Sequence, residues 1–418
     1  MLLTATVLAA RLKPLIPSVA LFSASVPYAI VAVSWSALSR ILPRRWFAIV
    51  DDFMWGCYQR FVLFFFETAS GAKLYFYGDY EECFRRKENV LYISNHQSSM
   101  DWIIADMLAI RQHSLGHLRY MLKEELKWIP LYGWYFYNHG CVYVRRGTKV
   151  FRRDITERSL GYLASAENIP FWMVLFPEGT RFNLQKPSVL EKSQRFALQN
   201  GFSPLRHHYM PRTSGTQLVL KHLRPRLDAV YDVTIIYTDS LPKKETARAG
   251  FTHSPKKTAA SSNGGPPSTF AELGGLNRQR QDAPSMFDLV LAPATTQIHV
   301  HIQRIPVGDL PPDEDPQAVT GWLYDRFLLK DNYFSRYLKQ GELFLDNSPM
   351  GSAGGSRSSG VGGRRIPLRF RDTVPQAIFF TSITVGMLYI PWLRKLYLVS
   401  GAVLTLGGFA YMWIREAA

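Results

Sequence analysis

The stretch Glu88–Asp101, ENVLYISNHQSSMD, decides the fold, because it passes from an apolar run through a polar turn into the helical pattern of Met100–Gln112. Residues 88–94 have the length and composition of a buried β-strand. Four further runs have the same character, and helical stretches separate the later ones: Cys141–Arg145, Phe171–Phe176, Ala229–Tyr237 and Ile298–Ile305. This alternation predicts an α/β fold with a mostly buried sheet flanked by helices.

The polar turn places His96 five residues before Asp101. On one continuous helix the two side chains would point about 140° apart, so their pairing requires the bend that a strand-to-helix loop supplies. A carboxylate bound to one imidazole nitrogen fixes the tautomer, and the other nitrogen is then free to take a proton from a substrate hydroxyl. Ser98 and Asp101 also fit a capping box, in which the acid caps the helix. The two roles are compatible.

Two further motifs join a predicted strand to arginines. GCVYVRR, Gly140–Arg146, ends in two cations, and Arg146 is a candidate for binding a phosphate on the substrate; a solvated strand end is the alternative. FPEGTR, Phe176–Arg181, offers Arg181 for the same task. Open α/β sheets bind ligands outside the carboxyl ends of their strands, so we expect both motifs and His96 to converge on one pocket.

Smaller features complete the candidate site. Gly179 would let the backbone approach a ligand. Glu178 would repel a phosphate, so we expect it to orient Arg181 or to accept a hydrogen bond from a substrate hydroxyl. Pro211, in HYMPR (His208–Arg212), is a candidate for the pocket wall, with an ordinary loop as the alternative.

Composition narrows the class of partner. The chain has 49 Lys and Arg against 33 Asp and Glu, a net charge of +16 that favours anionic partners. Its many aromatic residues lie in or beside apolar runs, which fits a membrane interface better than a nucleic-acid surface. Three widely separated cysteines without C-x-x-C spacing argue against a disulfide framework or a zinc cluster, so we expect no metal.

Apolar segments near both ends predict attachment to a membrane. Leu15–Leu38 has 24 residues without a charged side chain, about 36 Å as a helix, enough to cross a hydrocarbon core of about 30 Å; a signal peptide is the alternative. Val374–Ile390 and Leu396–Trp413 predict a helical hairpin, and the charges within Trp46–Phe66 place that segment at the interface. Arginines cluster before the hairpin, which by the positive-inside tendency puts the central domain in the cytosol.

These segments divide the chain into four parts. We expect a membrane anchor and interfacial segment over residues 1–68, a catalytic domain over 69–346, a linker rich in Gly, Ser and Arg over 347–371, and a membrane hairpin over 372–418. Within the second part, residues 238–284 are rich in Ser, Gly, Pro and Lys and predict a flexible insertion.

The three motifs N-H-x-x-x-x-D, G-x-x-F/Y-I/V-x-R and E-G-T-R, in this order, resemble those of the 1-acylglycerol-3-phosphate acyltransferase family, from about Leu91 to Ile236. Within this family, the amino-acid sequence of Asn95–Trp134 is most similar to that of the epsilon isoform. The resemblance implies a glycerolipid acyltransferase-like domain that uses acyl-CoA as co-substrate, with no cofactor. It implies His96 as the catalytic base and Asp101 as its partner. The expected substrate-binding residues are Asn95, Gly140, Arg146, Glu178, Gly179, Thr180 and Arg181.

We therefore expect acylation of the sn-2 hydroxyl of lysophosphatidic acid to give phosphatidic acid, in phospholipid biosynthesis. Another lysophospholipid acceptor, such as lysocardiolipin or lysophosphatidylinositol, remains open. A metal-dependent membrane phosphatase and a lipid-binding scaffold without enzymatic activity are less favoured. The expected partners are the two substrates and membrane lipid, without nucleic acid, and protein partners are unknown. We expect the endoplasmic reticulum membrane with a cytosolic catalytic domain, or alternatively the mitochondrial outer membrane.

Overall fold

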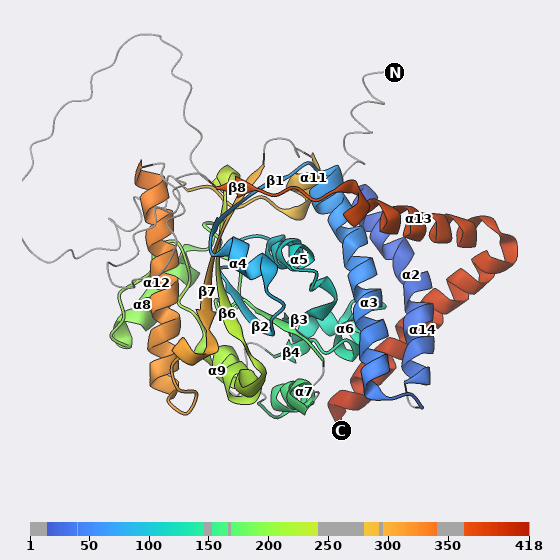
Figure 1. The fold of residues 1–418 in the computed structure, drawn as a ribbon, viewed down its shortest axis with the longest axis horizontal. Coiled ribbons are helices and arrows are strands. Elements are labelled where there is room, and N and C mark those ends of the chain that lie inside the picture. The colour runs from blue at the N-terminus through green and yellow to red at the C-terminus, as the bar shows by residue number, and fades with distance from the viewer. Residues whose placement is uncertain are drawn as a thin grey trace, which may run out of the picture.

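The computed structural model describes residues 15–39, 41–145, 153–165, 169–240, 280–291, 296–340 and 363–417 (Figure 1). Their centre is an eight-stranded sheet in the order β4-β3-β5-β2-β6-β7-β1-β8. The strands are β1 Lys73–Gly78, β2 Val90–Ser94, β3 Leu118–Lys123, β4 Val142–Val144, β5 Trp172–Leu175, β6 Ala229–Tyr237, β7 Gln297–Pro306 and β8 Arg364–Arg365. All pairs from β4 to β6 are parallel, so these five strands end at the same edge, whereas β6 pairs antiparallel with β7. All five predicted strands are confirmed.

Helices cover both faces of this sheet. On β2, Leu91 packs in a core cluster with residues of α7, α9 and α12, whereas its neighbour Tyr92 packs in a second cluster with residues of α3 and α5. Because successive residues of a strand point to opposite faces, a strand that is apolar throughout contributes side chains to the core on each face of the sheet. The helices of the domain are α4 Tyr80–Arg85, α5 Asp101–Arg111, α6 Tyr132–Asn138, α7 Arg153–Ser165, α8 Pro187–Gln199, α9 Thr213–Leu223, α11 Met286–Leu291 and α12 Pro316–Gln340. The predicted α/β class is confirmed.

The apolar segments from the two ends of the chain form one group of helices beside the domain (Figure 1). Its members are α2 Leu15–Leu38, α3 Arg44–Leu63, α13 Val374–Tyr389 and α14 Pro391–Ala417. Helices α13 and α14 both contact α2, and α3 continues into a π-helical turn, Phe64–Ala69. Helices α2 and α14 are long and apolar enough to cross a membrane, while α13 has only 16 residues. The predicted hairpin is therefore present as two helices, and the group supports association with a membrane.

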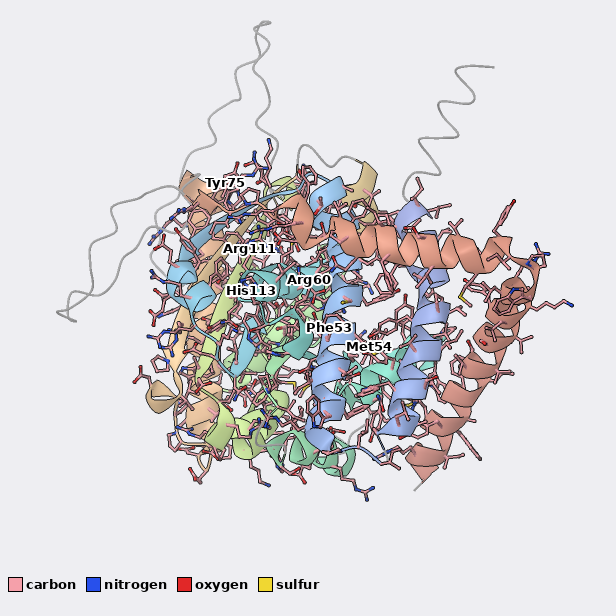
Figure 2. All side chains as sticks on the ribbon, turned by 45° about the vertical axis from the view of Figure 1, so that its right-hand side comes forward. Phe53, Met54, Arg60, Tyr75, Arg111 and His113 are labelled. Atoms are coloured by element: carbon pink, nitrogen blue, oxygen red, sulfur yellow. The ribbon has the colours of Figure 1, made fainter. Side chains whose placement is uncertain are left out.

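Two arginines fix the chain segment that leads into α13 (Figure 2). Arg60 on α3 donates a hydrogen bond to the carbonyl of Asp372 at 2.7 Å. Arg111 on α5 donates to the carbonyl of Ile366 at 2.6 Å and forms a buried ion pair with Glu67. The C-terminal helices are thus attached to the domain by backbone carbonyls as well as by apolar packing.

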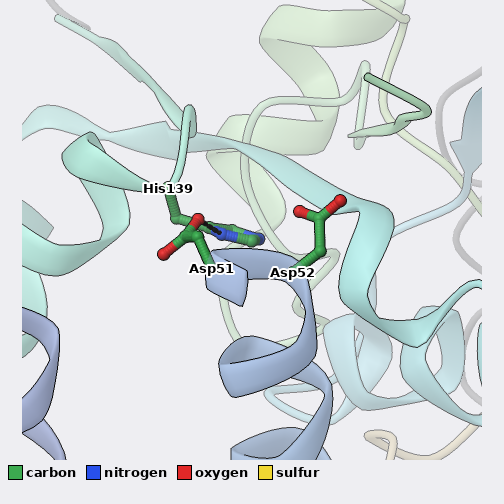
Figure 3. Close-up of side chains that lie close together, drawn as sticks. All are labelled: Asp51, Asp52 and His139. Atoms are coloured by element: carbon green, nitrogen blue, oxygen red, sulfur yellow. Dashed lines mark hydrogen bonds and ion pairs between the residues drawn. The ribbon is translucent and has the colours of Figure 1, made fainter. Parts of the chain in front are cut away.

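A buried ionic network joins α3 to the sheet, and we call its members, Asp51, Asp52, Arg119 and His139, the α3 network. Figure 3 shows the two acids and His139. Arg119 of β3 donates to Asp52 Oδ1 at 2.6 Å and to His139 Nε2 at 2.7 Å. Arginine only donates, so the ring proton of His139 lies on Nδ1, 2.6 Å from Asp51 Oδ2. Ligand atoms of the two acids and His139 lie within 4.8 Å of one another, a spacing that suits a metal ion. Arg119 already supplies the positive charge there.

Candidate functional site

His96 lies just beyond β2, at the edge where the parallel strands end. Its Nδ1 is 2.8 Å from Asp101 Oδ2, and its ring stacks on Phe176 with a centroid distance of 4.6 Å. The His96 side chain is 23% exposed, while Asp101 is completely buried. Within the described part of the chain, His96 Nε2 makes no hydrogen bond. The imidazole is therefore held from behind and presents one nitrogen to solvent.

Asp101 fixes the loop as well as the imidazole. Its Oδ2 also accepts hydrogen bonds from the backbone N–H groups of Gln97 at 2.6 Å and Ser98 at 2.9 Å. Its Oδ1 accepts one from the Tyr237 hydroxyl at 2.7 Å. The carboxylate thus holds the loop before α5 and orients His96 at the same time. Helix α5 itself begins after Met100 without a side-chain cap, so of the two roles expected from the spacing the geometry shows the pairing with His96 and not the helix cap.

Asn95 joins the end of β2 to β6. Its side-chain amide donates to the carbonyl of Ile235 at 3.0 Å and accepts from the N–H of Ile235 at 2.8 Å. Asn95 is completely buried, and both ends of its amide are used by β6. This side chain continues the pairing of β2 and β6 past the end of the strand, and its role in substrate binding stays a prediction.

Glu178 also differs from expectation. Its two carboxyl oxygens accept the backbone N–H groups of His96 at 2.7 Å and Tyr209 at 2.9 Å. Only 2% of the residue is exposed, so it neither orients Arg181 nor faces a substrate hydroxyl. The turn after β5 directs this carboxyl inward, where unpaired backbone N–H groups need an acceptor. Glu178 therefore positions the backbone of the candidate base.

Burial shifts the pKa of Glu178, and this shift makes the stability of the protein depend on pH. It raises the pKa of this carboxyl from 4.5 to about 8, although the two N–H donors and nearby Arg280 act in the opposite direction. The folded protein consequently holds this proton more tightly than the unfolded chain, and the stability it contributes falls as the pH rises from about 4.5 to about 8.

Glu178→Gln should remove this pH dependence, because glutamine resembles the protonated carboxyl and does not titrate. We expect the melting temperature of the wild type, relative to that of Glu178→Gln, to decrease between pH 5 and pH 8. Thermal unfolding of both proteins in the same detergent measures it. Parallel curves over this pH range would contradict a raised pKa at Glu178.

Position 179 favours glycine because of its backbone angle and because the Arg212 side chain lies close to it. It has φ +72°, and a Cβ there would lie 3.2 Å from Cδ of Arg212. The predicted close approach is therefore real, but the approaching group is the Arg212 side chain, which the sequence did not single out. Arg181 and Arg212 are exposed and Thr180 is half-buried. The N–H of Phe182 donates to the carbonyl of His96 at 2.8 Å, which brings the FPEGTR turn next to the imidazole.

The GCVYVRR motif is only partly at this edge. Gly140 precedes β4 and therefore lies at the opposite, amino edge of the sheet, where a Cβ would meet Arg119 Nε at 3.3 Å. Its role in substrate binding stays a prediction. Arg146 lies outside the described residues. Arg145 ends the strand at the correct edge and forms an ion pair with Glu124 at 2.9 Å.

The HYMPR loop runs beside the FPEGTR turn. The N–H of Arg212 donates to the carbonyl of Pro177 at 2.8 Å, and Pro211 itself is buried. The structure thus brings Pro211 next to the turn that carries Glu178 and Arg181, and its role as pocket wall stays a prediction.

Residues 280–286, which we call the strap, cross the loop that carries His96. Arg280 donates to Gln97 Oε1 at 2.6 Å and to the carbonyl of His207 at 2.7 Å, and it lies between the rings of Phe182 and Phe334. The hydroxyl of Ser98 donates to the carbonyl of Pro284, and the N–H of Met286 donates to Ser99 Oγ at 3.2 Å.

Arg280 belongs to the segment for which the sequence predicts a flexible insertion. In the structure its side chain is buried, with only 5% of the residue exposed. Burial lowers the pKa of its guanidinium to about 10, so the group remains positive at neutral pH beside Glu178.

Taken together, the arrangement of these side chains suits the removal of a proton from a hydroxyl group. His96 offers Nε2 as acceptor, Asp101 stabilises the resulting imidazolium, and Arg181 and Arg212 add positive charge at the rim. The substrate expected there carries both a nucleophilic hydroxyl and negative charge.

Comparison with known proteins agrees with this chemistry. Residues 79–238 match the acyltransferase family, and residues 289–367 match the acyltransferase C-terminus family. The chain is 33% identical to 1-acyl-sn-glycerol-3-phosphate acyltransferase epsilon of Mus musculus, over 99% of this chain and 100% of that protein. It is 28% identical to the probable 1-acyl-sn-glycerol-3-phosphate acyltransferase 5 of Arabidopsis thaliana, over 74% and 70% of the two chains. The solved acyltransferase PlsC from Thermotoga maritima is 15% identical, with a TM-score of 0.36 over 77% of this chain and 97% of that one.

Proposed function

The chain belongs to the 1-acyl-sn-glycerol-3-phosphate acyltransferase family, and we propose that it transfers an acyl group from acyl-CoA to the sn-2 hydroxyl of lysophosphatidic acid, giving phosphatidic acid and CoA. The observation that supports this most is His96, held at Nδ1 by the buried Asp101 and open at Nε2. The reaction uses acyl-CoA as co-substrate and requires no cofactor.

In the proposed reaction, His96 Nε2 takes the proton of the acceptor hydroxyl while the hydroxyl oxygen attacks the thioester carbonyl. The new C–O bond forms, the C–S bond breaks, and the imidazolium returns the proton to the sulfur of the departing CoA. Asp101 holds the Nδ1 proton in place and stabilises the imidazolium. General-base catalysis contributes roughly 10² to 10⁴-fold, so the alignment of both substrates must supply much of the remaining acceleration.

The acceptor phosphate is proposed to bind Arg181 and Arg212. Both side chains are exposed, and the turn that carries Arg181 is hydrogen-bonded to the backbone of His96. A guanidinium matches the geometry of phosphate oxygens, so this pair would place the sn-2 hydroxyl relative to Nε2.

Arg181→Ala should weaken acceptor binding. A hydrogen bond to a charged group contributes about 1.5–3 kcal/mol, so we expect the KM for lysophosphatidic acid to rise roughly 10- to 100-fold, with little change in the KM for acyl-CoA. Initial rates at varied concentrations of each substrate measure this split. Arg195→Ala, an exposed arginine on α8, is the matched control. An altered acyl-CoA KM with an unchanged acceptor KM would reassign Arg181 to CoA.

The identity of the acceptor is tested with purified protein and labelled oleoyl-CoA. A panel of lysophosphatidic acid, lysocardiolipin and lysophosphatidylinositol should give the highest kcat/KM with lysophosphatidic acid. Higher turnover of either of the other two would replace the proposed acceptor while leaving acyl transfer intact.

We further propose that the enzyme resides in the endoplasmic reticulum membrane with its catalytic domain in the cytosol, the mitochondrial outer membrane being the alternative. The arginines before α13 support the cytosolic orientation. Organelle fractionation followed by protease protection of intact vesicles distinguishes these arrangements.

A further inference from the structure

A cavity of about 400 Å³ lies at the opposite edge of the sheet from His96. Its walls come from the ends of α2 and α14, from α6 and α7, and from Gly140 and Cys141, which precede β4. The candidate active site follows β2 and β5 instead, so one strand length, on the order of 15 Å, separates the two edges. The cavity is within the usual size range of ligand sites and is not part of the active site.

The cavity is basic and aromatic. Arg158 of α7 and Arg415 of α14 line it, and none of the described side chains in its wall is acidic. The Arg415 guanidinium lies 4.7 Å from the centre of the Tyr137 ring, and its Nη1 donates to the Tyr411 hydroxyl at 3.3 Å. Tyr162 completes the aromatic wall. Two guanidinium groups with phenol hydroxyls form a suitable environment for a phosphate.

The cavity opens where the apolar helices end. On α14, Trp413 and Ile414 are exposed next to Arg415, and Leu38 at the end of α2 and Trp46 at the start of α3 are exposed nearby in the chain. Aromatic residues and arginines at the end of an apolar helix are typical of the headgroup region of a membrane. A ligand in this cavity can therefore keep acyl chains on the apolar helices and its headgroup against the arginines.

We propose that this cavity binds the phosphate-bearing headgroup of an anionic membrane lipid, at a second lipid site separate from the one that performs acyl transfer. Arg158 and Arg415 bind the phosphate oxygens, and the tyrosine hydroxyls complete the contacts. The site attaches α14, the last helix of the chain, to α7 of the catalytic domain through a lipid.

A thiol at the rim reports occupancy of this site alone. Ser39 lines the cavity, so Ser39→Cys in the full-length protein in detergent is labelled with a maleimide and followed by peptide-resolved mass spectrometry, with Cys57 as internal reference. Dihexanoyl phosphatidate at about ten times its Kd should slow labelling at position 39 about tenfold. Dihexanoyl phosphatidylcholine and inorganic phosphate should protect much less.

Charge removal completes the test. The double variant Arg158→Gln with Arg415→Gln should abolish the protection of position 39 by phosphatidate and leave acyl transfer in detergent unchanged. The control variant Lys192→Gln with Arg195→Gln removes two exposed cations of α8 and should keep the protection. Arg158→Lys with Arg415→Lys should retain partial protection, which separates loss of charge from loss of folding. Absent protection, or equal protection in the double glutamine variant, would overturn the proposal. Equal protection by inorganic phosphate would replace the lipid with a free anion.

Discussion

His96→Ala is expected to abolish acyl-CoA-dependent formation of phosphatidate, with kcat reduced at least about 100-fold, because general-base catalysis contributes roughly 10² to 10⁴-fold. The side chain is partly exposed at a loop, where its ring stacks on Phe176 and pairs with the Asp101 carboxylate. Its removal should therefore leave the fold and the amount of membrane-bound protein unchanged. Membranes that contain equal amounts of wild type and variant, assayed with labelled oleoyl-CoA, measure the loss.

Two further variants make this test specific. Asp101→Asn should also lose most activity, because the amide presents a donor or a weaker acceptor to His96 Nδ1 and no longer stabilises the imidazolium. His222→Ala on α9 removes a histidine that pairs with Glu157 away from the site and should retain activity. Phosphatidate formation by His96→Ala at the wild-type rate would exclude His96 as the base. Chelator-sensitive turnover without acyl-CoA would instead favour a phosphatase.

Arg119→Leu should cause the largest loss of stability. Arg119 is 3% exposed and is the cation of the α3 network, where it donates to Asp52 and His139. Removing one partner of a buried ion pair leaves an uncompensated charge and costs about 3–5 kcal/mol. Burial and Arg119 both lower the pKa of His139, so in the wild type Arg119 and not His139 carries the positive charge of the network. Denaturant unfolding in detergent measures the change.

The double variant Arg119→Leu with Asp52→Asn is the matched control. It removes the acid that faces Arg119 at 2.6 Å together with the cation, so we expect it to recover part of the lost stability. If Arg119→Leu costs less than about 1 kcal/mol, the network contributes little to the attachment of α3.

The sequence was informative where interactions are local. His96 and Asp101 are five residues apart in a loop between an apolar strand and a helix, and this short segment alone restricts how they can meet. The buried strands were equally clear, because runs such as β6 have nine consecutive buried residues between turn-forming segments.

The direction of a side chain was harder to predict than its position. The EGTR motif correctly marked the turn after β5, but Glu178 points inward to two backbone N–H groups that come from residues 82 and 31 positions away. Asn95 likewise binds a strand 140 residues further along the chain. Neither partner can be found from local spacing, because backbone donors carry no signature in the sequence.

Arg280 was missed for a different reason. The prediction of a flexible insertion over residues 238–284 rests on the average composition, and one cation at the end of such a stretch does not change that average. Its surroundings, Phe182, Phe334, Gln97 and His207, come from separate parts of the chain. Arg212 was missed because its importance depends on Gly179 lying beneath it.

The contact of α13 and α14 with α2 also has a consequence during synthesis on the ribosome. About 350 residues separate the end of α2 from the start of α14, so at roughly 5–20 residues per second the ribosome needs about 20–70 s after completing α2 to reach α14. Strand β1 waits similarly for its partners β7 and β8. During that interval a lipid surface can shield the exposed apolar side of α2. The membrane thus serves the growing chain as a substitute for α13 and α14 before it serves the finished enzyme.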